Sequence, residues 1–231
     1  METKPNQPVS PKIAYEMSGR GIIRKAAGLV NAHFDKSARI LELGSGKGAL
    51  AERLLDLGFK GLTCSDINAD DFALLHRVGF LQIDGNSDFS GLFREPFDLV
   101  IALEVIEHLE NPWHFFREVK KMLKPGGSLI LSTPNIDSVK SRLEFMKKGR
   151  FCFFYDSDYR IGGHITPLPR FTLDYLIEKH GFRVRHYERN AMSYLFHKPG
   201  HIIQFLIHRL LASMLVKKPD FGECHIFWLE A

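Results

Sequence analysis

Cysteine is scarce in this chain of 231 residues, and Cys64, Cys152 and Cys224 lie far apart. Such spacing excludes a disulfide framework and the paired cysteines of a zinc site, and it favours a reduced, cytoplasmic setting. An apolar run is also missing from the start, METKPNQPVSPK, which therefore does not read as a signal peptide. We expect a cytoplasmic protein.

A strong excess of one charge is also absent. The chain has 31 Lys and Arg against 27 Asp and Glu, for a net charge of +4. Its basic pairs, at 120–121, 147–148 and 217–218, are short and are explained by solvated helix ends. Nucleic acid is therefore not the expected partner, because a binding groove needs clustered basic residues.

Short β-rich runs alternate with helical patterns up to residue 135. Strands are expected at 38–44, 61–67, 80–85, 97–103 and 128–134, and helices at 19–34, 47–58, 68–79 and 112–127. Further along, helices are expected at 137–148, 172–182 and 199–218, and strands at 182–188 and 223–231. This alternation of strands and helices predicts an α/β fold, with a doubly wound and mostly parallel sheet covered by helices on both faces.

A glycine-rich turn follows the first strand, in LELGSGKG. Glycine there lets backbone N–H groups approach a ligand closely. The P-loop pattern fails, because Lys47 follows Gly46 too soon. The dinucleotide pattern fits only in part, since its third glycine comes early, at Gly48. The loop alone therefore leaves the ligand open.

Acidic residues after neighbouring strands narrow the choice. Glu42 precedes the glycines, Asp66 ends the second strand and can take both hydroxyls of a ribose, and Asp84-Gly85 ends the third. With these in place, the chain resembles the class I S-adenosylmethionine-dependent methyltransferases. The resemblance covers residues 38–135 and rests on ELGSGKG, SDI, IDG, FDLVIALEVIEHL and LKPGGSLILSTPN.

This resemblance implies a Rossmann-like, seven-stranded sheet whose last strand is antiparallel. It also implies that S-adenosyl-L-methionine and its product S-adenosyl-L-homocysteine bind along the ends of the strands. The expected cofactor-binding residues are Glu42, Gly44, Ser45, Gly46, Gly48, Asp66, Ile67, Asp84, Gly85, Leu103 and Glu104. In addition, Arg20 or Arg24 is expected to reach the cofactor carboxylate.

The stretch EVIEHL follows the fourth strand, where open α/β sheets bind ligands. If it forms a helical turn, Glu104, Glu107 and His108 share a face. A histidine held by a carboxylate suits removal of a proton from a hydroxyl nucleophile. The candidate catalytic residues are these three and His164, and the same four are the ligands of a divalent metal ion if one is bound.

The E-x-x-E-H pattern resembles two groups of methyltransferases. One contains the quinone-pathway and other small-molecule O-methyltransferases. The other contains the small-RNA 2′-O-methyltransferases, in which two Glu and two His bind a metal. This chain lacks the basic, aromatic motif around the distal histidine and the added RNA-binding domain of that second group.

We expect a single methyltransferase domain over residues 1–231. Its parts are an N-terminal helical cover (1–37), a cofactor-binding core (38–135), a lid or substrate insertion (136–170) and a C-terminal part of the sheet (171–231) with an inserted apolar helix (199–216). That helix is too interrupted to span a bilayer. It would pack on the sheet or on a partner chain, as in a homodimer, or make peripheral contact with a membrane.

The sequence thus predicts an S-adenosylmethionine-dependent methyltransferase that O-methylates a small or lipid-like acceptor. One alternative is a metal-dependent RNA 2′-O-methyltransferase. Two others come from different classes, a cofactor-binding regulatory protein and a nicotinamide-dependent oxidoreductase. The absence of any hydride-transfer constellation argues against the oxidoreductase, and EVIEHL argues against a regulator without catalysis.

Overall fold

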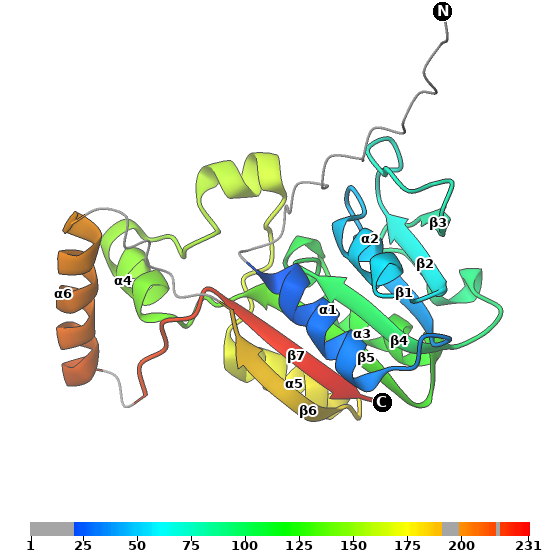
Figure 1. Cartoon of the computed structure of the whole chain (residues 1–231). Helices are drawn as coiled ribbons and strands as arrows, with labels where there is room; N and C mark the ends of the chain where they lie inside the picture. Colours follow the sequence, from blue (N-terminus) through cyan, green and yellow to red (C-terminus); the bar gives the residue numbers. More distant parts are fainter. Residues whose placement is uncertain (1–20, 191–198, 216–217) are drawn as a thin grey trace, which may run out of the picture.

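The computed structural model describes residues 21–190, 199–215 and 218–231. At its centre lies a seven-stranded sheet with the order β3-β2-β1-β4-β5-β7-β6 (Figure 1). Its strands are β1 (Arg39–Leu43), β2 (Gly61–Asp66), β3 (Gly79–Gln82), β4 (Phe97–Leu103), β5 (Leu123–Pro134), β6 (Arg183–Arg189) and β7 (Cys224–Glu230). Only β7 is antiparallel to its neighbours, β5 and β6. The predicted fold class is confirmed.

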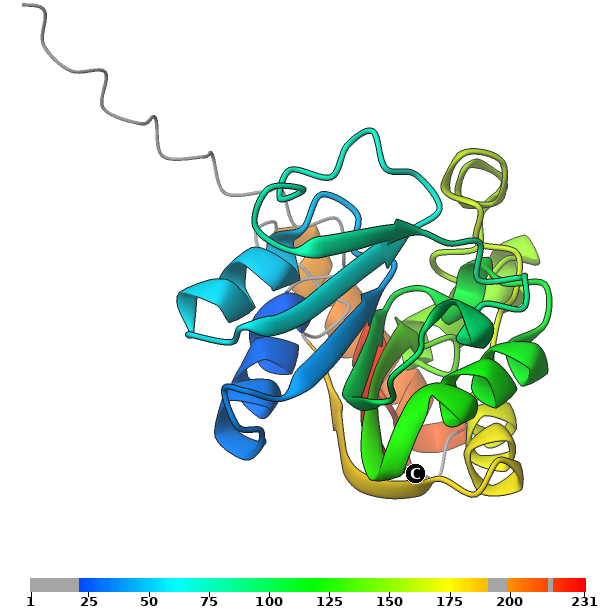
Figure 2. The ribbon, with the colours of Figure 1, turned by 90° about the vertical axis from the view of Figure 1, so that its right-hand side faces the viewer.

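Helices cover both faces of the sheet (Figure 2). They are α1 (Ile22–His33), α2 (Ala49–Asp56), α3 (Pro112–Met122), α4 (Val139–Lys148), α5 (Arg170–Lys179) and α6 (Pro199–Leu215). One apolar core joins α1 and α2 to one face of the sheet, and the other joins α3 and α5 to the opposite face. The central strand β4 has the sequence FDLVIAL, and all its residues except Asp98 are buried. Such a continuous apolar run is typical of a strand covered on both faces.

The segment 68–79 is not the predicted helix. It forms consecutive turns, and side-chain oxygens explain why: the Asn68 N–H donates to Asp66 Oδ1 at 3.1 Å and the Asp70 N–H donates to Asn68 Oδ1 at 2.9 Å. Asn and Asp favour turns by bonding to the backbone two residues on. Phe72 and Leu74 are nevertheless buried, and they pack beside the start of α2.

The stretch after β4 also differs from the expected helical turn. Glu104 has a φ of 57°, in the left-handed region, and only a 3-10 turn, Ile106–His108, follows. A non-glycine residue there is uncommon. The helical turn that would give Glu104 and Glu107 a shared face therefore does not form at this place.

Beyond β5, the chain forms α4, an irregular segment with a π-helical turn at Asp158–Gly162, and then α5. Helix α6 has α4 as its main packing partner among the described elements, rather than the sheet. The two helices lie together beside one end of the sheet (Figure 1). No helix within the described residues is both long enough and apolar enough to cross a membrane.

Candidate active site

A cavity of about 710 Å³ opens at the C-terminal ends of β1, β2 and β4. Ten of the eleven predicted cofactor-binding residues line it, namely Glu42, Gly44, Ser45, Gly46, Asp66, Ile67, Asp84, Gly85, Leu103 and Glu104. Gly48 does not line it. With a φ of 91°, this residue instead closes the turn into α2, and a Cβ there would lie 3.0 Å from Leu74 Cδ1.

The glycine loop needs its glycines for two separate reasons. Gly44 has a φ of 72°, and a Cβ there would come within 2.4 Å of Val105 Cγ2. Gly46 also has a positive φ, and its N–H donates to Asp66 Oδ2 at 2.7 Å. Between them, the buried Ser45 hydroxyl has no hydrogen-bond partner among the described residues. Because buried polar atoms are normally bonded, this hydroxyl fits a ligand in the cavity.

Asp66 and Ile67 form the adjoining wall. Asp66 accepts one backbone hydrogen bond on each carboxylate oxygen, from Gly46 and Asn68, so each oxygen keeps capacity for a ligand hydroxyl. The next residue, Ile67, is 64% exposed although it lines the cavity. An exposed apolar side chain there suits the face of an aromatic base. On the other side, a Cβ on Gly85 would lie 2.9 Å from Leu109 Cδ2, so this position has no room for a larger residue.

Two glutamates of the cavity are held by thiols. The Cys64 thiol donates to Glu42 Oε2 at 3.7 Å, and burial raises the pKa of Glu42 to about 8. For Glu104, the Ser132 hydroxyl donates to Oε1 at 2.8 Å and the Cys224 thiol donates to Oε2 at 3.4 Å. Burial raises the pKa of Glu104 as well. Both carboxyl groups are thus biased toward the neutral form.

Sequence reasoning did not find Ser132 or Cys224. They lie on β5 and β7, and Cys224 also lines the cavity. Antiparallel pairing sets Ser132 opposite Ile226 and Pro134 opposite Cys224, which brings the start of the last strand to this end of the sheet. The available signal was the expected last, antiparallel strand at 223–231.

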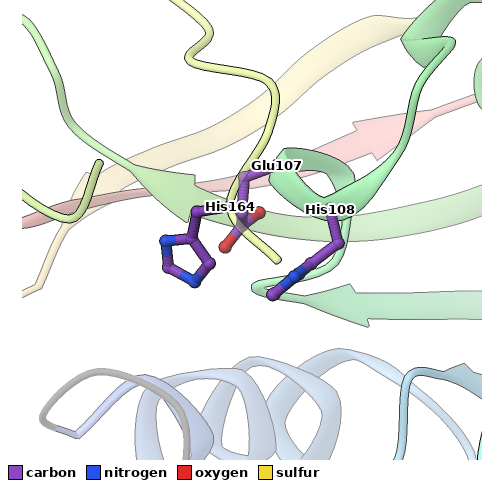
Figure 3. A group of neighbouring side chains, drawn as sticks. All are labelled: Glu107, His108 and His164. Carbon is purple, nitrogen blue, oxygen red and sulfur yellow. The ribbon is translucent and has the colours of Figure 1, made fainter. Parts of the chain in front are cut away.

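Glu107, His108 and His164 form a cluster in which a ligand atom from each lies within 4.8 Å of the others. Figure 3 shows their side chains directed toward a common space. Glu107 is fully buried and does not line the cavity, whereas both histidines do. Glu104 is outside this cluster, since its carboxylate bonds to Ser132 and Cys224 instead. The expected convergence therefore involves Glu107, His108 and His164 only.

The Glu107 carboxylate has one oxygen occupied and one without a protein partner. Its Oε2 accepts a hydrogen bond from the Thr133 hydroxyl at 3.1 Å, while the buried Oε1 has no hydrogen-bond partner in the part of the chain that the structure describes. Burial raises the pKa of Glu107 well above its usual range, and the nearby Glu104 adds to this. Its backbone carbonyl accepts the N–H groups of Ile165 and Thr166 at 3.0 and 2.9 Å. These two bonds fix the segment that carries His164 against the 3-10 turn.

The two imidazoles are oriented by backbone carbonyls. His164 Nδ1 lies 2.7 Å from the Phe153 carbonyl, which can only accept, so Nδ1 donates this hydrogen bond. His108 is half-buried, with backbone carbonyls of Gly163 and Gly162 beside it. Burial and, secondly, His164 lower the pKa of His108, and the carbonyls only partly oppose this. His108 is therefore neutral near pH 7.

A second cavity, of about 380 Å³, meets the first at His164. It is lined by residues of the expected lid, including Phe151, Phe154 and Tyr159. His164 therefore lies between the cavity of the glycine loop and an aromatic cavity. On the N-terminal side, Ile23 of α1 lines the main cavity, and Arg24 does not. Arg20 lies outside the described residues.

Comparison with known proteins matches residues 18–187 to a family described as a methyltransferase domain. The chain belongs to this methyltransferase domain family. The match confirms the family that the sequence motifs had predicted.

Curated relatives match the methyltransferase domain in part. A ubiquinone biosynthesis O-methyltransferase of Caulobacter sp. (strain K31) is 35% identical over 103 residues, 42% of this chain and 41% of that protein. The corresponding enzyme of Xanthomonas oryzae pv. oryzae (strain PXO99A) is 34% identical over 114 residues, 46% of this chain and 47% of that protein. The chain therefore spans less than half the length of the curated relatives that it matches.

Solved structures share the fold of the methyltransferase domain over nearly its whole length. An S-adenosylmethionine-dependent methyltransferase of Archaeoglobus fulgidus aligns with a TM-score of 0.62 at 18% identity, covering 92% of this chain and 96% of that chain. The methyltransferase CalH, solved with S-adenosylhomocysteine, aligns at 0.58 and 18% identity, covering 90% and 55%. These alignments show that the chain has the fold of S-adenosylmethionine-dependent methyltransferases.

Proposed function

We propose that this methyltransferase transfers the methyl group of S-adenosyl-L-methionine to a hydroxyl oxygen of a small or lipid-like acceptor. One observation carries the proposal: a single cavity is lined both by the glycine loop and by His108 and His164. A cofactor on the loop and a hydroxyl beside the histidines would thus meet in one enclosed space. Holding two reactants in this way replaces a bimolecular encounter by a positioned one.

Residues of the glycine loop and of the neighbouring strand ends have groups suited to each part of S-adenosyl-L-methionine. The free Ser45 hydroxyl and the backbone of Gly46 suit its methionine portion, and Asp66 suits the ribose hydroxyls. Ile67 offers an apolar surface for the base, with Asp84 on the opposite wall. When bound, the cofactor supplies an electrophilic methyl group on a positively charged sulfonium.

His108 is the group best placed to take the proton of the acceptor hydroxyl. Its lowered pKa keeps it neutral and able to accept a proton at neutral pH. The carbonyls of Gly162 and Gly163 favour its protonated form, so they assist the imidazole once it has accepted the proton. His164 then acts as a neighbour that sets the proton affinity of His108.

An apolar acceptor is favoured by the rest of the lining. Val105, Leu109, Phe89, Phe115 and Phe153 contribute to the main cavity, and aromatic side chains line the adjoining one. The ubiquinone biosynthesis O-methyltransferases among the relatives support an acceptor that combines a hydroxyl-bearing ring with an apolar part. We expect such a phenol to be methylated in preference to RNA, because neither lining offers the aligned basic residues that follow a phosphate backbone.

A metal-assisted variant of the same reaction is favoured by one specific observation. Glu107 Oε1 is buried without a partner, and the His108 and His164 nitrogens lie near this carboxylate. One carboxylate and two imidazoles form a donor set that suits Zn²⁺, Mn²⁺ or Fe²⁺. A cation held by these three residues would supply Lewis-acid activation of the hydroxyl.

A labelled-methyl assay tests the proposal and separates its two variants. The protein is incubated with methyl-labelled S-adenosylmethionine and, in parallel, polyprenylated catechols, simple catechols and small RNA. We expect label in the catechols and none in the RNA. Treatment with a chelator, followed by Mn²⁺ or Zn²⁺, should leave the rate unchanged if His108 acts as a base, and abolish and then restore it if the cluster binds metal. Transfer to RNA alone would contradict the acceptor that we propose.

A further inference from the structure

Helix α6 exposes apolar side chains on its outer side. Seven of them are between 38% and 75% exposed, namely Ile202, Ile203, Leu206, Ile207, Leu210, Leu211 and Met214. The inner side has Gln204 and His208, which are half-buried, and the buried Ala212. A surface helix of a globular protein normally shows the reverse arrangement, with its apolar stripe facing the core. We call these seven side chains the α6 apolar face.

The neighbouring helix extends this unusual surface. Helix α4, on which α6 packs, exposes Met146 by 76% and Phe145 by 46%. Both helices lie to one side of the sheet, so the α6 apolar face is not covered by the rest of the described protein (Figure 1). Scattered exposed apolar residues are ordinary, but a gathered set of this size marks an interaction site.

Charge on the same two helices indicates the chemistry of the partner. Residues 139–150 contain five Lys or Arg, of which Arg142, Lys148 and Arg150 form ion pairs with Asp137, Glu144 and Asp156. Residues 199–215 contain Arg209 and no Asp or Glu. Arg209 is exposed among the apolar side chains of α6, and Lys147 is exposed beside Met146. The partner should therefore offer both apolar material and negative charge.

A second copy of the chain does not meet this requirement. A two-fold contact through the α6 apolar face would place the same surface on both sides, because such interfaces are self-complementary. Lys147 and Arg209 of one copy would then approach those of the other, while the one acid of these two helices, Glu144, is already paired with Lys148. An anionic lipid bilayer, in contrast, supplies apolar chains below a negatively charged surface.

We propose that α6 is a docking helix that lies in the headgroup region of an anionic lipid bilayer. Its 17 residues are about 25 Å long, and a helix of this kind lies parallel to the membrane plane with its apolar face buried. Such docking agrees with the absence of a spanning helix among the described residues. Helix α4 leads directly into the segment that carries His164, so the docked face is joined to one wall of the candidate active site.

Vesicle co-sedimentation of the full chain tests this proposal. Vesicles of phosphatidylcholine alone are compared with vesicles that contain one quarter phosphatidylglycerol. We expect binding to the anionic vesicles and at least tenfold weaker binding to the neutral ones, with a marked loss at high salt. Leu206→Ser combined with Leu210→Ser should weaken binding to anionic vesicles about tenfold or more. Lys147→Glu combined with Arg209→Glu should also weaken binding to anionic vesicles about tenfold or more. The binding that remains should depend little on salt concentration.

The matched control is Leu75→Ser combined with Leu92→Ser, since these leucines are 59% and 55% exposed outside α4 and α6. This pair should bind vesicles like the unaltered protein. Thermal unfolding of every variant shows whether it is folded. The proposal would be overturned if the unaltered protein did not bind anionic vesicles. It would also be overturned if the variant with Leu206→Ser and Leu210→Ser bound these vesicles as tightly as the unaltered protein. A dimer that dissociates on substitution of Leu206 and Leu210, without vesicle binding, would overturn it too and identify a self-association surface.

Discussion

The rings of His108 and His164 meet edge to face, with centroids 4.7 Å apart and planes inclined at 85°. The contact joins the turn after β4 to the segment before α5, which are far apart in the sequence. It depends on backbone bonds from Ile165 and Thr166 to the Glu107 carbonyl, which hold the two segments together. After burial, the neighbouring His164 is the second cause that lowers the pKa of His108.

His108→Ala should reduce turnover by about 10²–10⁴-fold, the usual contribution of a positioned acid–base group. The affinity for S-adenosylhomocysteine should remain nearly unchanged, because Asp66 and the glycine loop are untouched. Steady-state kinetics and calorimetry measure the two quantities. His76→Ala is a matched control, since His76 is exposed in the turns of 68–79 and does not line the cavity. Turnover equal to that of the unaltered protein would assign His108 a structural role only.

The pH dependence of kcat/KM follows from the lowered pKa of His108. A base works in its neutral form, so the rate should fall as the pH decreases through the pKa of His108, which lies below the ordinary 6.5. Burial is the main cause of this lowering and His164 the second; His164→Phe keeps the site buried and removes only the second cause. The acidic limb of the profile should then move to higher pH. An unchanged limb would show that the two imidazoles are not coupled.

The sheet and the glycine loop could be predicted from the sequence because their signals are local. A strand such as FDLVIAL needs only its own apolar residues to be recognised, and Gly44 and Asp66 are placed by the ends of their strands. The turns of 68–79 could not be distinguished from a helix in this way. Asn68 and Asp70 resemble helix caps in sequence, yet their backbone N–H groups donate to the side chains of Asp66 and Asn68, which close turns instead.

The details of the candidate site depend on contacts between distant segments. The left-handed φ of Glu104 becomes understandable only when Ser132 and Cys224 are seen to hold its carboxylate. These partners lie on two other strands, and no spacing near Glu104 indicates them. For α6, the sequence left open whether its apolar residues face the sheet, a partner chain or a membrane, and only the packing on α4 shows which side chains are exposed.

Asp66→Ala should weaken binding of S-adenosylmethionine and S-adenosylhomocysteine by about 1–3 kcal/mol, the scale for leaving a buried polar group without its partner. The loss has two sources: the ligand hydroxyls lose their acceptor, and the Gly46 N–H loses the carboxylate that holds the loop. Calorimetry measures the change. Asp71→Ala, at an exposed position in the following turns, should bind like the unaltered protein. Equal affinity in both variants would remove Asp66 from the cofactor site.

Glu42→Gln should flatten the dependence of protein stability on pH. Burial raises the pKa of Glu42 to about 8 in the folded state, while its ordinary value is 4.5. The stability that depends on its proton is therefore fully present below about pH 4.5, and is lost as the pH rises through about 8. The glutamine amide of the variant is neutral at every pH and can still accept a hydrogen bond from the Cys64 thiol. The variant therefore does not lose stability at this position as the pH rises.

Urea unfolding without cofactor, at pH 5.5, 7 and 8.5, measures the effect. Between the lowest and highest pH, the stability of Glu42→Gln relative to the unaltered protein should rise by at least about 1 kcal/mol, because one unit of pKa shift corresponds to about 1.4 kcal/mol. Glu104 and Glu107 also have raised pKa values, but they occur in both proteins and cancel in the difference. Asp56→Asn, at an exposed position of α2, controls for loss of a surface charge. A difference that does not change with pH would mean that Glu42 is ionised in the folded protein at neutral pH, and therefore available to a positively charged group of the cofactor.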